Sequence, residues 1–381
     1  MEWKHTLMNK NIIFMKNNIE KEDEQKLKHY YSRYGGFWVY PEMLDYCYLV
    51  NPYFNRSKII DEMQANFRML VSEYPAGMGV NSKLAGECWH IKEEYIIPGN
   101  GAAELIKALM ENLEGMVGVV RPTFEEYPNR LPDERVVTFV PENDTFRYDA
   151  EDLMEFFGTH PVDTLLLINP DNPSGNFIPM SGVHKLAEWC ETNSIRFVLD
   201  ESFVDFSVGF KDNTFLDNSV LEKYPHMCVM KSISKSYGVP GLRLGILCSA
   251  DKGLIAKMKK QVSIWNINSF AEFFMQIYPK YREDYHRACE QFIKAREDFE
   301  AELKRIPFIK VMPSQANYFF LEVLPPYNPV ELCAVLLKKY NILASACLAK
   351  KGIEPNKYMR IAVRNHGDNA KFIEAMYELI K

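Results

Sequence analysis

The sequence predicts an α/β fold, in which a large domain with a mainly parallel sheet is followed by a smaller α+β C-terminal domain. Short apolar runs of strand length alternate with helical patterns until Cys248. After Cys248 the pattern changes, and helix-forming charged and apolar residues dominate 251–306. A chain of 381 residues is also long enough for two cores. We therefore expect an N-terminal segment over 1–45, a large domain over 46–265 and a small domain over 266–381.

The elements of the large domain can be read in order along the chain. A helical pattern runs from Lys58 to about Ser72 and ends before Tyr74. Seven short apolar runs are interpreted as buried strands: Tyr95–Ile97, Val117–Val120, Val136–Val140, Thr164–Ile168, Arg196–Leu199, Met227–Met230 and Leu244–Cys248. Helical patterns separate several of them, at 102–113, 149–158 and 181–192. Strands that alternate with helices at this spacing imply crossovers and a mainly parallel sheet.

The C-terminal part contains fewer and shorter strands. A long amphipathic helix is expected from about Tyr281 to Arg305. Strands and helices then alternate, with strands expected at 317–323 and 358–363 and helices at 329–339 and 368–380. This arrangement is typical of a smaller α+β domain.

Composition excludes several classes of protein. Hydrophobic residues make up 47% and charged residues 25%, as in ordinary globular proteins. The net charge is −6 and the basic residues form no run, so nucleic acid is not expected as a partner. The first residues contain no apolar run long enough for a signal peptide or a membrane span. Eight scattered cysteines without a C-x-x-C pair favour free thiols in the cytoplasm over disulfides or a metal site.

Four segments follow the expected strands, where ligands bind in open parallel sheets. The first is the glycine turn Pro98–Ile106, whose helix N-terminus can bind phosphate through backbone amides, although such turns also occur for steric reasons alone. The second is Asn169–Gly175, in which two Asn-Pro steps direct Asn172 back over the strand ends. Turns of this composition are common, so this segment carries weight only together with the others.

The third and fourth segments contain ionisable groups. Val198–Phe203 ends an apolar strand with acids, and a buried carboxylate is unfavourable unless it is paired. A protonated pyridinium nitrogen would be such a partner, and a helix-capping role for Asp200 is the alternative. Ser232–Gly245 places Lys235 among hydroxyls, glycines and Arg243. An amine near other cations has a lowered pKa and forms imines readily, whereas a solvated surface loop of this composition would carry no chemistry.

Taken in this order, the four segments resemble those of fold-type I aminotransferases of class I/II, which depend on pyridoxal 5'-phosphate (PLP). The resemblance is closest to the branch of histidinol-phosphate aminotransferase and threonine-phosphate decarboxylase, and covers roughly residues 45–381. It implies that Lys235 is the catalytic residue, which holds PLP as a Schiff base and moves the Cα proton. It further implies that Asp200 pairs with the pyridine nitrogen, that Asn172 donates to the phenolic oxygen and that Phe124 stacks on the ring.

The resemblance also implies which groups bind the cofactor phosphate. They are the amides of Ala102 and Ala103, the hydroxyls of Ser232 and Ser234, the side chain of Arg243 and, from the neighbouring subunit, Tyr74. A homodimer with shared active sites is therefore expected.

Four further positions are expected to bind the substrate, namely Gly36 in a substrate-covering N-terminal loop, Asn317, Arg360 and Arg364. The resemblance implies that Arg360 binds a substrate carboxylate through a two-pronged bond. Arg360 and Arg364 lie four residues apart in an expected strand, so their side chains would share one face. They could bind the two ends of a doubly anionic substrate, or Arg364 could form a structural ion pair. No metal site is expected.

The chain departs from the family at Phe203, where a tyrosine usually hydrogen-bonds the phenolic oxygen; the threonine-phosphate decarboxylase branch also has phenylalanine there. Residues 1–28 match no family segment. The leading hypothesis is an aminotransferase that acts between a small anionic amine or amino acid, with a phosphate or phosphonate group, and a 2-oxo acid. The alternatives are a 2-aminoethylphosphonate transaminase and a PLP-dependent decarboxylase of threonine phosphate. A non-enzymatic binding module is disfavoured, because Lys235, Asp200 and Asn172 are all present.

Overall fold

The computed structural model describes residues 21–48, 50–54, 57–348 and 350–380. Its contacts divide the chain into two compact units. The larger unit comprises Val50–Lys294 and Ser314–Asn317, and the smaller unit comprises Met1–Leu49, Ala295–Pro313 and Tyr318–Lys381. The contacts thus group residues 266–294 with the larger unit. That domains which fold independently meet at residues 45 and 265 stays a prediction.

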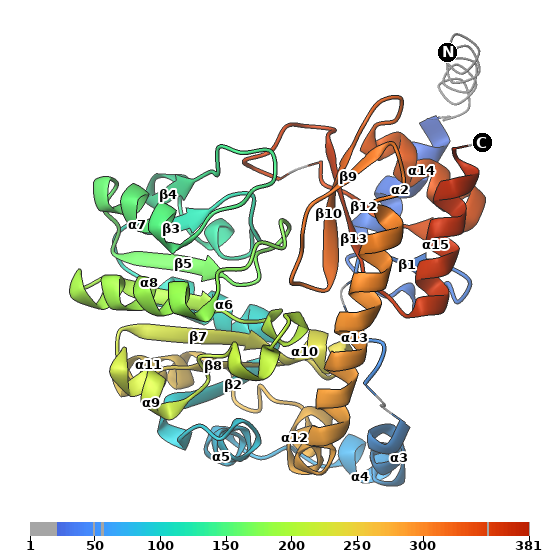
Figure 1. Ribbon diagram of the computed structural model, residues 1–381. Coiled ribbons are helices and arrows are strands. Elements are labelled where there is room, and N and C mark those ends of the chain that lie inside the picture. The colour runs from blue at the N-terminus through green and yellow to red at the C-terminus, as the bar shows by residue number, and fades with distance from the viewer. Residues whose placement is uncertain (1–20, 49, 55–56, 349, 381) are drawn as a thin grey trace, which may run out of the picture. The chain divides into compact units, whose positions relative to one another are not determined.

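A seven-stranded sheet forms the centre of the larger unit (Figure 1). In spatial order its strands are β2 (Ile96–Asn100), β8 (Leu244–Cys248), β7 (Met227–Ser232), β6 (Arg196–Asp200), β5 (Thr164–Ile168), β3 (Val117–Val120) and β4 (Val136–Phe139). Strand β8 is antiparallel to β2 and β7, and the neighbours from β7 to β4 are parallel. The mainly parallel sheet predicted from the sequence is confirmed.

Helices surround this sheet in the chain order expected of crossover connections. They are α3 (Ser57–Ala65), α4 (Phe67–Ser72), α5 (Met78–Trp89), α6 (Ala102–Asn112), α7 (Ala150–Thr159), α8 (Met180–Thr192), α9 (Asn218–Lys223), α10 (Ile233–Ser236), α11 (Lys252–Gln261) and α12 (Ser269–Ile277). The helix α13 (Arg282–Leu303) follows them. Local capping fixes several starts. At α7, for example, Asp149 and Asp152 form a reciprocal capping box. No described helix is both long and apolar enough to cross a bilayer.

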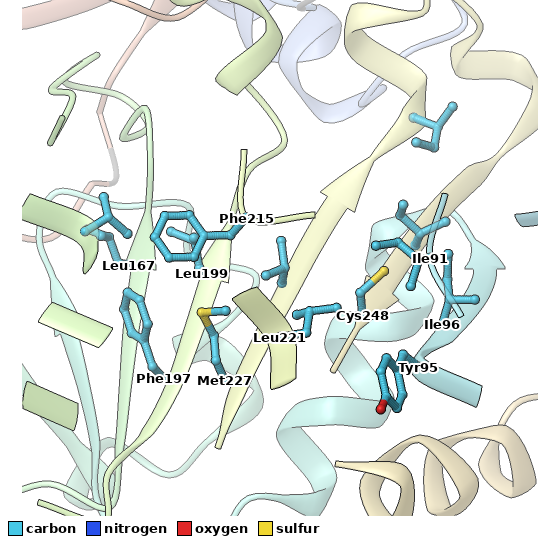
Figure 2. Packing of buried hydrophobic residues seen from close by; sticks show 14 of the residues in the cluster. Ile91, Tyr95, Ile96, Leu167, Phe197, Leu199, Phe215, Leu221, Met227 and Cys248 are labelled. Atoms are coloured by element: carbon cyan, nitrogen blue, oxygen red, sulfur yellow. The ribbon is translucent and has the colours of Figure 1, made fainter. Parts of the chain in front are cut away.

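Both faces of the sheet are buried, because side chains alternate along each strand and helices pack on either side. On one face Leu167 of β5 and Phe197 of β6 belong to a cluster that includes residues of α5, α7, α8 and α12. Figure 2 shows part of this cluster, with Phe215 beside the strands. On the other face Leu166 and Val198 pack with α6 and α11. This two-sided burial explains why the strands read as continuous apolar runs in the sequence.

The single helix expected over 58–72 was wrong in one respect, because the structure contains two helices there, α3 and α4. They are separated at Asn66, whose side-chain Nδ2 donates to the Glu62 carbonyl at 2.9 Å. An asparagine that bonds to a carbonyl of the preceding turn competes with the helical ladder. The periodic apolar pattern continues through the break, so periodicity alone could not locate it.

The smaller unit contains a four-stranded antiparallel sheet and a short parallel pair. The larger of these sheets has the order β12 (Ser345–Ala346), β13 (Tyr358–Ala362), β10 (Tyr318–Val323) and β9 (Ile309–Val311). Strands β1 (Leu44–Asp45) and β11 (Ile342–Leu343) form the pair. The helices that accompany them are α2 (Lys21–Ser32), α14 (Pro329–Tyr340) and α15 (His366–Glu378). The α+β character predicted for the C-terminal part is confirmed.

The buried acid Glu201 in the larger unit is hydrogen-bonded to protein groups rather than to solvent. Glu201 follows β6 and is 1% exposed. Its Oε1 accepts from the Phe215 N–H and its Oε2 from the Thr214 hydroxyl, each at 2.6 Å. Burial raises the pKa of Glu201 from 4.5 to about 7, against the opposing influence of the nearby Lys231.

Glu201→Gln is expected to remove a pH dependence of stability. Because its pKa is raised, Glu201 contributes fully to stability below about pH 4.5. This contribution is lost as the pH rises through about 7. The full loss corresponds to about 3 kcal/mol. The thermal midpoint of the variant, relative to that of the wild type, should therefore rise as the pH is raised from 5 to 8. Glu290→Gln, at an exposed ion pair with Lys211, is the control. Parallel curves for Glu201→Gln and the wild type would contradict the assignment.

Candidate active site

The strand order brings several predicted residues to one edge of the seven-stranded sheet. Ile168 of β5 is in register with Asp200 of β6, and Asp200 is in register with Met230 of β7. The carboxyl ends of these parallel strands therefore meet at the same edge. The loops that follow β5 and β6 carry Asn172 and Phe203, and the short helix α10 that follows β7 carries Lys235.

The reversed strand β8 adds the glycine turn to this edge. Gly245 of β8 is in register with Ser232 of β7 on one side and with Gly99 of β2 on the other. The end of β2, and with it the start of α6, therefore lies near Ser232. This places two of the four sequence segments, far apart in the chain, at one location.

Glycines keep this location open for backbone contacts. A Cβ atom at Gly245 would overlap the backbone nitrogen of Ala102, and a Cβ at Gly101 would overlap the guanidinium of Arg243. Gly101 also has a φ of 74°, which favours glycine. Its N–H donates to the Arg243 carbonyl at 2.9 Å. The Arg243 side chain is thus held against the turn that begins α6.

The donors at this turn suit an anion with several oxygen atoms. Helix α6 begins at Ala102 without a side-chain cap, so the amides of Ala102 and Ala103 point out of its positive end. The Ser234 hydroxyl is buried and has no hydrogen-bond partner in the described part of the chain. An orphaned buried hydroxyl near backbone amides and a guanidinium fits a phosphate group. The predicted set Ala102, Ala103, Ser232, Ser234 and Arg243 is therefore chemically consistent.

Lys235 presents its amine to two aromatic rings. Its Nζ lies 3.9 Å from the ring centroid of Phe203 and 5.9 Å from that of Phe124. The backbone carbonyl of Lys235 accepts from the Asn51 N–H at 2.9 Å and from the Gly238 N–H at 3.2 Å. The lysine is half-buried at the end of the sheet, with its main chain fixed.

Asp200 is a buried acid with defined donors. Its Oδ2 accepts from the Tyr127 hydroxyl at 2.7 Å, and its Oδ1 accepts from the Ser202 N–H at 2.8 Å. Burial and the adjacent Asp200 carboxylate raise the pKa of Tyr127 well above its ordinary value, so this hydroxyl stays protonated and donates. Tyr127 was not singled out from the sequence. The signal that could have indicated it is the general need of a buried acid for a donor.

Asn172 lies in a turn that is buried and bonded internally. The Asn169 side chain exchanges two bonds of 2.9 Å with the backbone of Ile178, which ties the ends of the turn together. Gly175 has a φ of 74° and packs so closely on Ser314 that a Cβ there would overlap the serine side chain. The segment 314–317 therefore lies beside this turn. Within it Asn317 is fully buried, and neither side-chain amide atom has a hydrogen-bond partner in the described structure.

The remaining predicted substrate residues belong to the smaller unit. Arg360, in β13, donates from Nη2 to the Cys47 carbonyl at 2.9 Å and lies 5.5 Å from the ring of Tyr318. Gly36 has a φ of 72°, and its carbonyl accepts from Arg33 at 3.3 Å.

The expectation that Arg364 shares a strand with Arg360 was wrong. Strand β13 ends at Ala362, because the chain turns into α15, whose first turn is capped by Asn365. The Arg364 guanidinium pairs with Asp368 at 2.9 Å and donates to the Asp45 carbonyl at 2.8 Å. These contacts match the structural ion pair that was one of the two interpretations of this residue.

Tyr74 lies on the surface of the larger unit. It is 79% exposed, and its ring centroid lies 4.5 Å from that of Trp265. Across the described ranges, no group of three His, Cys, Asp or Glu side chains could hold a metal ion.

Comparison with known proteins gives matches along most of the chain. It is 31% identical to an L-serine phosphate decarboxylase of Sulfurospirillum multivorans over 351 residues, covering 89% of this chain and 88% of that protein. It is 30% identical to a CMP-5'-(3-aminopropyl)phosphonate synthase of Streptomyces rubellomurinus, covering 92% of this chain but only 55% of that protein. The chain thus spans about half the length of the Streptomyces protein. A solved decarboxylase structure from Sulfurospirillum multivorans matches with a TM-score of 0.81 at 30% identity, covering 91% of each chain.

A family model for class I and II aminotransferases matches residues 81–376. The match includes all four sequence segments and the sheet edge that carries Lys235. The proteins of this family depend on PLP, and the donors at the start of α6 and the buried acid Asp200 fit that cofactor. The chain therefore belongs to the class I and II aminotransferase family of fold-type I PLP-dependent enzymes.

Proposed function

We propose that the chain is a PLP-dependent decarboxylase of a small amino acid with a phosphate group, for which L-serine phosphate is the first candidate. The observation that carries the proposal is the packing of Phe203 against the Lys235 amine at 3.9 Å. Phenylalanine at this position is a feature that the chain has in common with the decarboxylase branch of the family. The match to an L-serine phosphate decarboxylase along nearly all of both chains supports the same reaction.

In this proposal the cofactor is held by the residues at the sheet edge. The amides of Ala102 and Ala103 and the side chains of Ser232, Ser234 and Arg243 would bind its phosphate. Phe124 would cover the ring face, and Asn172 would donate to the phenolic oxygen. When bound, PLP supplies an electron sink that stabilises negative charge at the substrate Cα.

Side chains of this protein would hold the proton on the pyridine nitrogen and deliver the proton to the substrate Cα. Asp200, whose carboxylate already accepts from Tyr127 and Ser202, retains lone pairs with which to hold a proton on the pyridine nitrogen. The Nζ of Lys235 would deliver a proton to the substrate Cα after carbon dioxide has left. The neighbouring rings of Phe203 and Phe124 carry no group that could take up this proton.

The reaction itself can be tested with a donor screen. O-phospho-L-serine, O-phospho-L-threonine, histidinol phosphate and 2-aminoethylphosphonate would be incubated with the PLP-loaded enzyme, with and without 2-oxoglutarate. We expect carbon dioxide and phosphoethanolamine in equal amounts from O-phospho-L-serine, without a need for the 2-oxo acid. Turnover that consumes 2-oxoglutarate and releases no carbon dioxide would overturn the decarboxylase assignment.

The second candidate is an aminotransferase that acts between a small phosphate- or phosphonate-bearing amine and a 2-oxo acid, including 2-aminoethylphosphonate transamination. The match to a CMP-5'-(3-aminopropyl)phosphonate synthase favours an amine with a phosphonate group. The same screen separates this candidate from the first, because only transamination consumes the 2-oxo acid.

A homodimer with shared active sites is part of the proposal. Helix α4 exposes Phe67, Met69 and Val71, whose exposed fractions are 57%, 49% and 62%, and the exposed Tyr74 follows it. Several exposed apolar side chains on one short helix are typical of a surface that a second subunit covers. The thiols of all eight cysteines are free, which supports the cytoplasm as the compartment. Recovery of the enzyme only in a membrane or periplasmic fraction would contradict that location.

Subunit mixing tests whether Tyr74 serves the partner's site. A chain with Tyr74→Ala and a chain with Lys235→Ala should each be inactive alone. A mixed dimer would contain one site with both residues intact and should regain activity. Failure to regain activity, in mixtures shown to exchange subunits, would place Tyr74 outside the neighbouring site.

Lys235→Ala is expected to abolish covalent retention of PLP and to lower turnover roughly 10²–10⁴-fold, because the amine both holds the cofactor and moves the proton. Borohydride treatment followed by peptide mass spectrometry measures the retention. The control is Lys211→Ala, which removes an exposed lysine that pairs with Glu290. Borohydride fixation of PLP in the Lys235→Ala variant would show that another amine holds the cofactor.

The two arginines of the smaller unit should respond differently to substitution. Arg360→Ala should raise KM for anionic donors roughly 10–100-fold, as expected for the loss of a charge-assisted bond. Arg364→Ala should leave KM within about twofold and lower the thermal midpoint, since its guanidinium is held by Asp368 and the Asp45 carbonyl. A raised KM with an unchanged midpoint in Arg364→Ala would instead place that residue on the substrate.

A further inference from the structure

A second buried carboxylate lies behind the residues proposed to bind the cofactor. Asp205, in the short turn Val204–Phe206, is 6% exposed. Its Oδ1 accepts from Lys231 Nζ at 2.7 Å, and its Oδ2 accepts from the Ser236 hydroxyl at 2.8 Å. All three side chains are almost completely buried.

The two partners of Asp205 flank the segment that carries the proposed chemistry. Lys231 directly precedes Ser232, and Ser236 directly follows Lys235. Each end is bonded to a different oxygen of the same carboxylate, so a rotation of that carboxylate would disturb both ends together. The segment 232–235 is therefore fixed at its two ends by one side chain.

The loop that contains Asp205 makes a further bond to the same segment. The Ser202 hydroxyl accepts from the Ser232 N–H at 2.9 Å. From the end of β6 into this loop, the residues assigned to the cofactor in the proposed site, Asp200 and Phe203, alternate with Ser202 and Asp205, which bond to the lysine segment and its two flanking residues. These bonds join the chain after β6 to both ends of the lysine segment.

We propose that Asp205 is a positioning residue, which fixes the Lys235 segment relative to Asp200 so that the amine can capture PLP. The inference rests on the cofactor role proposed for Lys235. It assigns no contact between Asp205 and cofactor or substrate. Small displacements of a reacting group lower rates strongly, so loosening the segment should affect capture more than the fold.

The test uses a charge-neutral pair of substitutions, because removing only one member of a buried ion pair leaves the other charge uncompensated. Asp205→Leu combined with Lys231→Met removes both charges and both bonds. Asp205→Asn combined with Lys231→Met removes the charges but keeps an acceptor for Ser236. Apoenzyme of each variant and of the wild type would be mixed with PLP, and the appearance of a borohydride-stable label on Lys235 would be followed over time.

We expect the double variant with Asp205→Leu and Lys231→Met to capture PLP about tenfold more slowly than the wild type, or more slowly still. The capture rate of the double variant with Asp205→Asn should lie between these two rates. Capture by the Asp205→Leu pair at the wild-type rate would overturn the inference. Should that pair fail to fold by circular dichroism, Ser236→Ala decides instead: slowed capture supports the inference and wild-type capture overturns it. A wild type that forms no label on Lys235 would refute the proposed site itself, which is a distinguishable result.

Discussion

The requirement that every buried charge has a partner governs the carboxyl edge of the large sheet. The strands that end there are covered on both faces, so water cannot neutralise the acids that follow them. Asp200 is bonded to Tyr127, and Asp205 to Lys231 and Ser236. These bonds select for the observed arrangement of the loops, because breaking them would leave buried charge without a partner. The geometry around the lysine amine follows from this selection.

The fold was predictable from the sequence because its signals are local. A strand buried on both faces must be apolar along its whole length, and the run Thr164–Ile168 became β5 with the same limits. The break between α3 and α4 escaped prediction because it depends on one side-chain bond of Asn66, which leaves no mark on the apolar periodicity. Strand β13 similarly ended before Arg364, where the cap of α15 takes over.

The candidate site was predictable to the extent that its residues follow strands directly. Asp200 ends β6, Asn172 follows β5 and Lys235 lies in α10 directly after β7, and the sheet order brings these strand ends to one edge. Tyr127 and Asp205 were not predictable in this way, because their importance lies in bonds to residues distant in the chain. A tyrosine or aspartate in a loop has many ordinary explanations, and only the three-dimensional pairing distinguishes among them.

The reversed direction of β8 has a consequence for how the protein acquires its cofactor during synthesis. Gly245 in β8 joins the end of β2 to the end of β7, so the turn at Gly101, which we propose binds the cofactor phosphate, is placed among its neighbours by parts far apart in the chain. Long-range strand pairing of this kind is slow to form. A nascent chain that has not yet produced β8 lacks the neighbour that places Ala102 near Ser232. The proposed phosphate site is therefore complete only once β8, the last strand of the large sheet in chain order, has been made, which would couple cofactor loading to completion of the sheet.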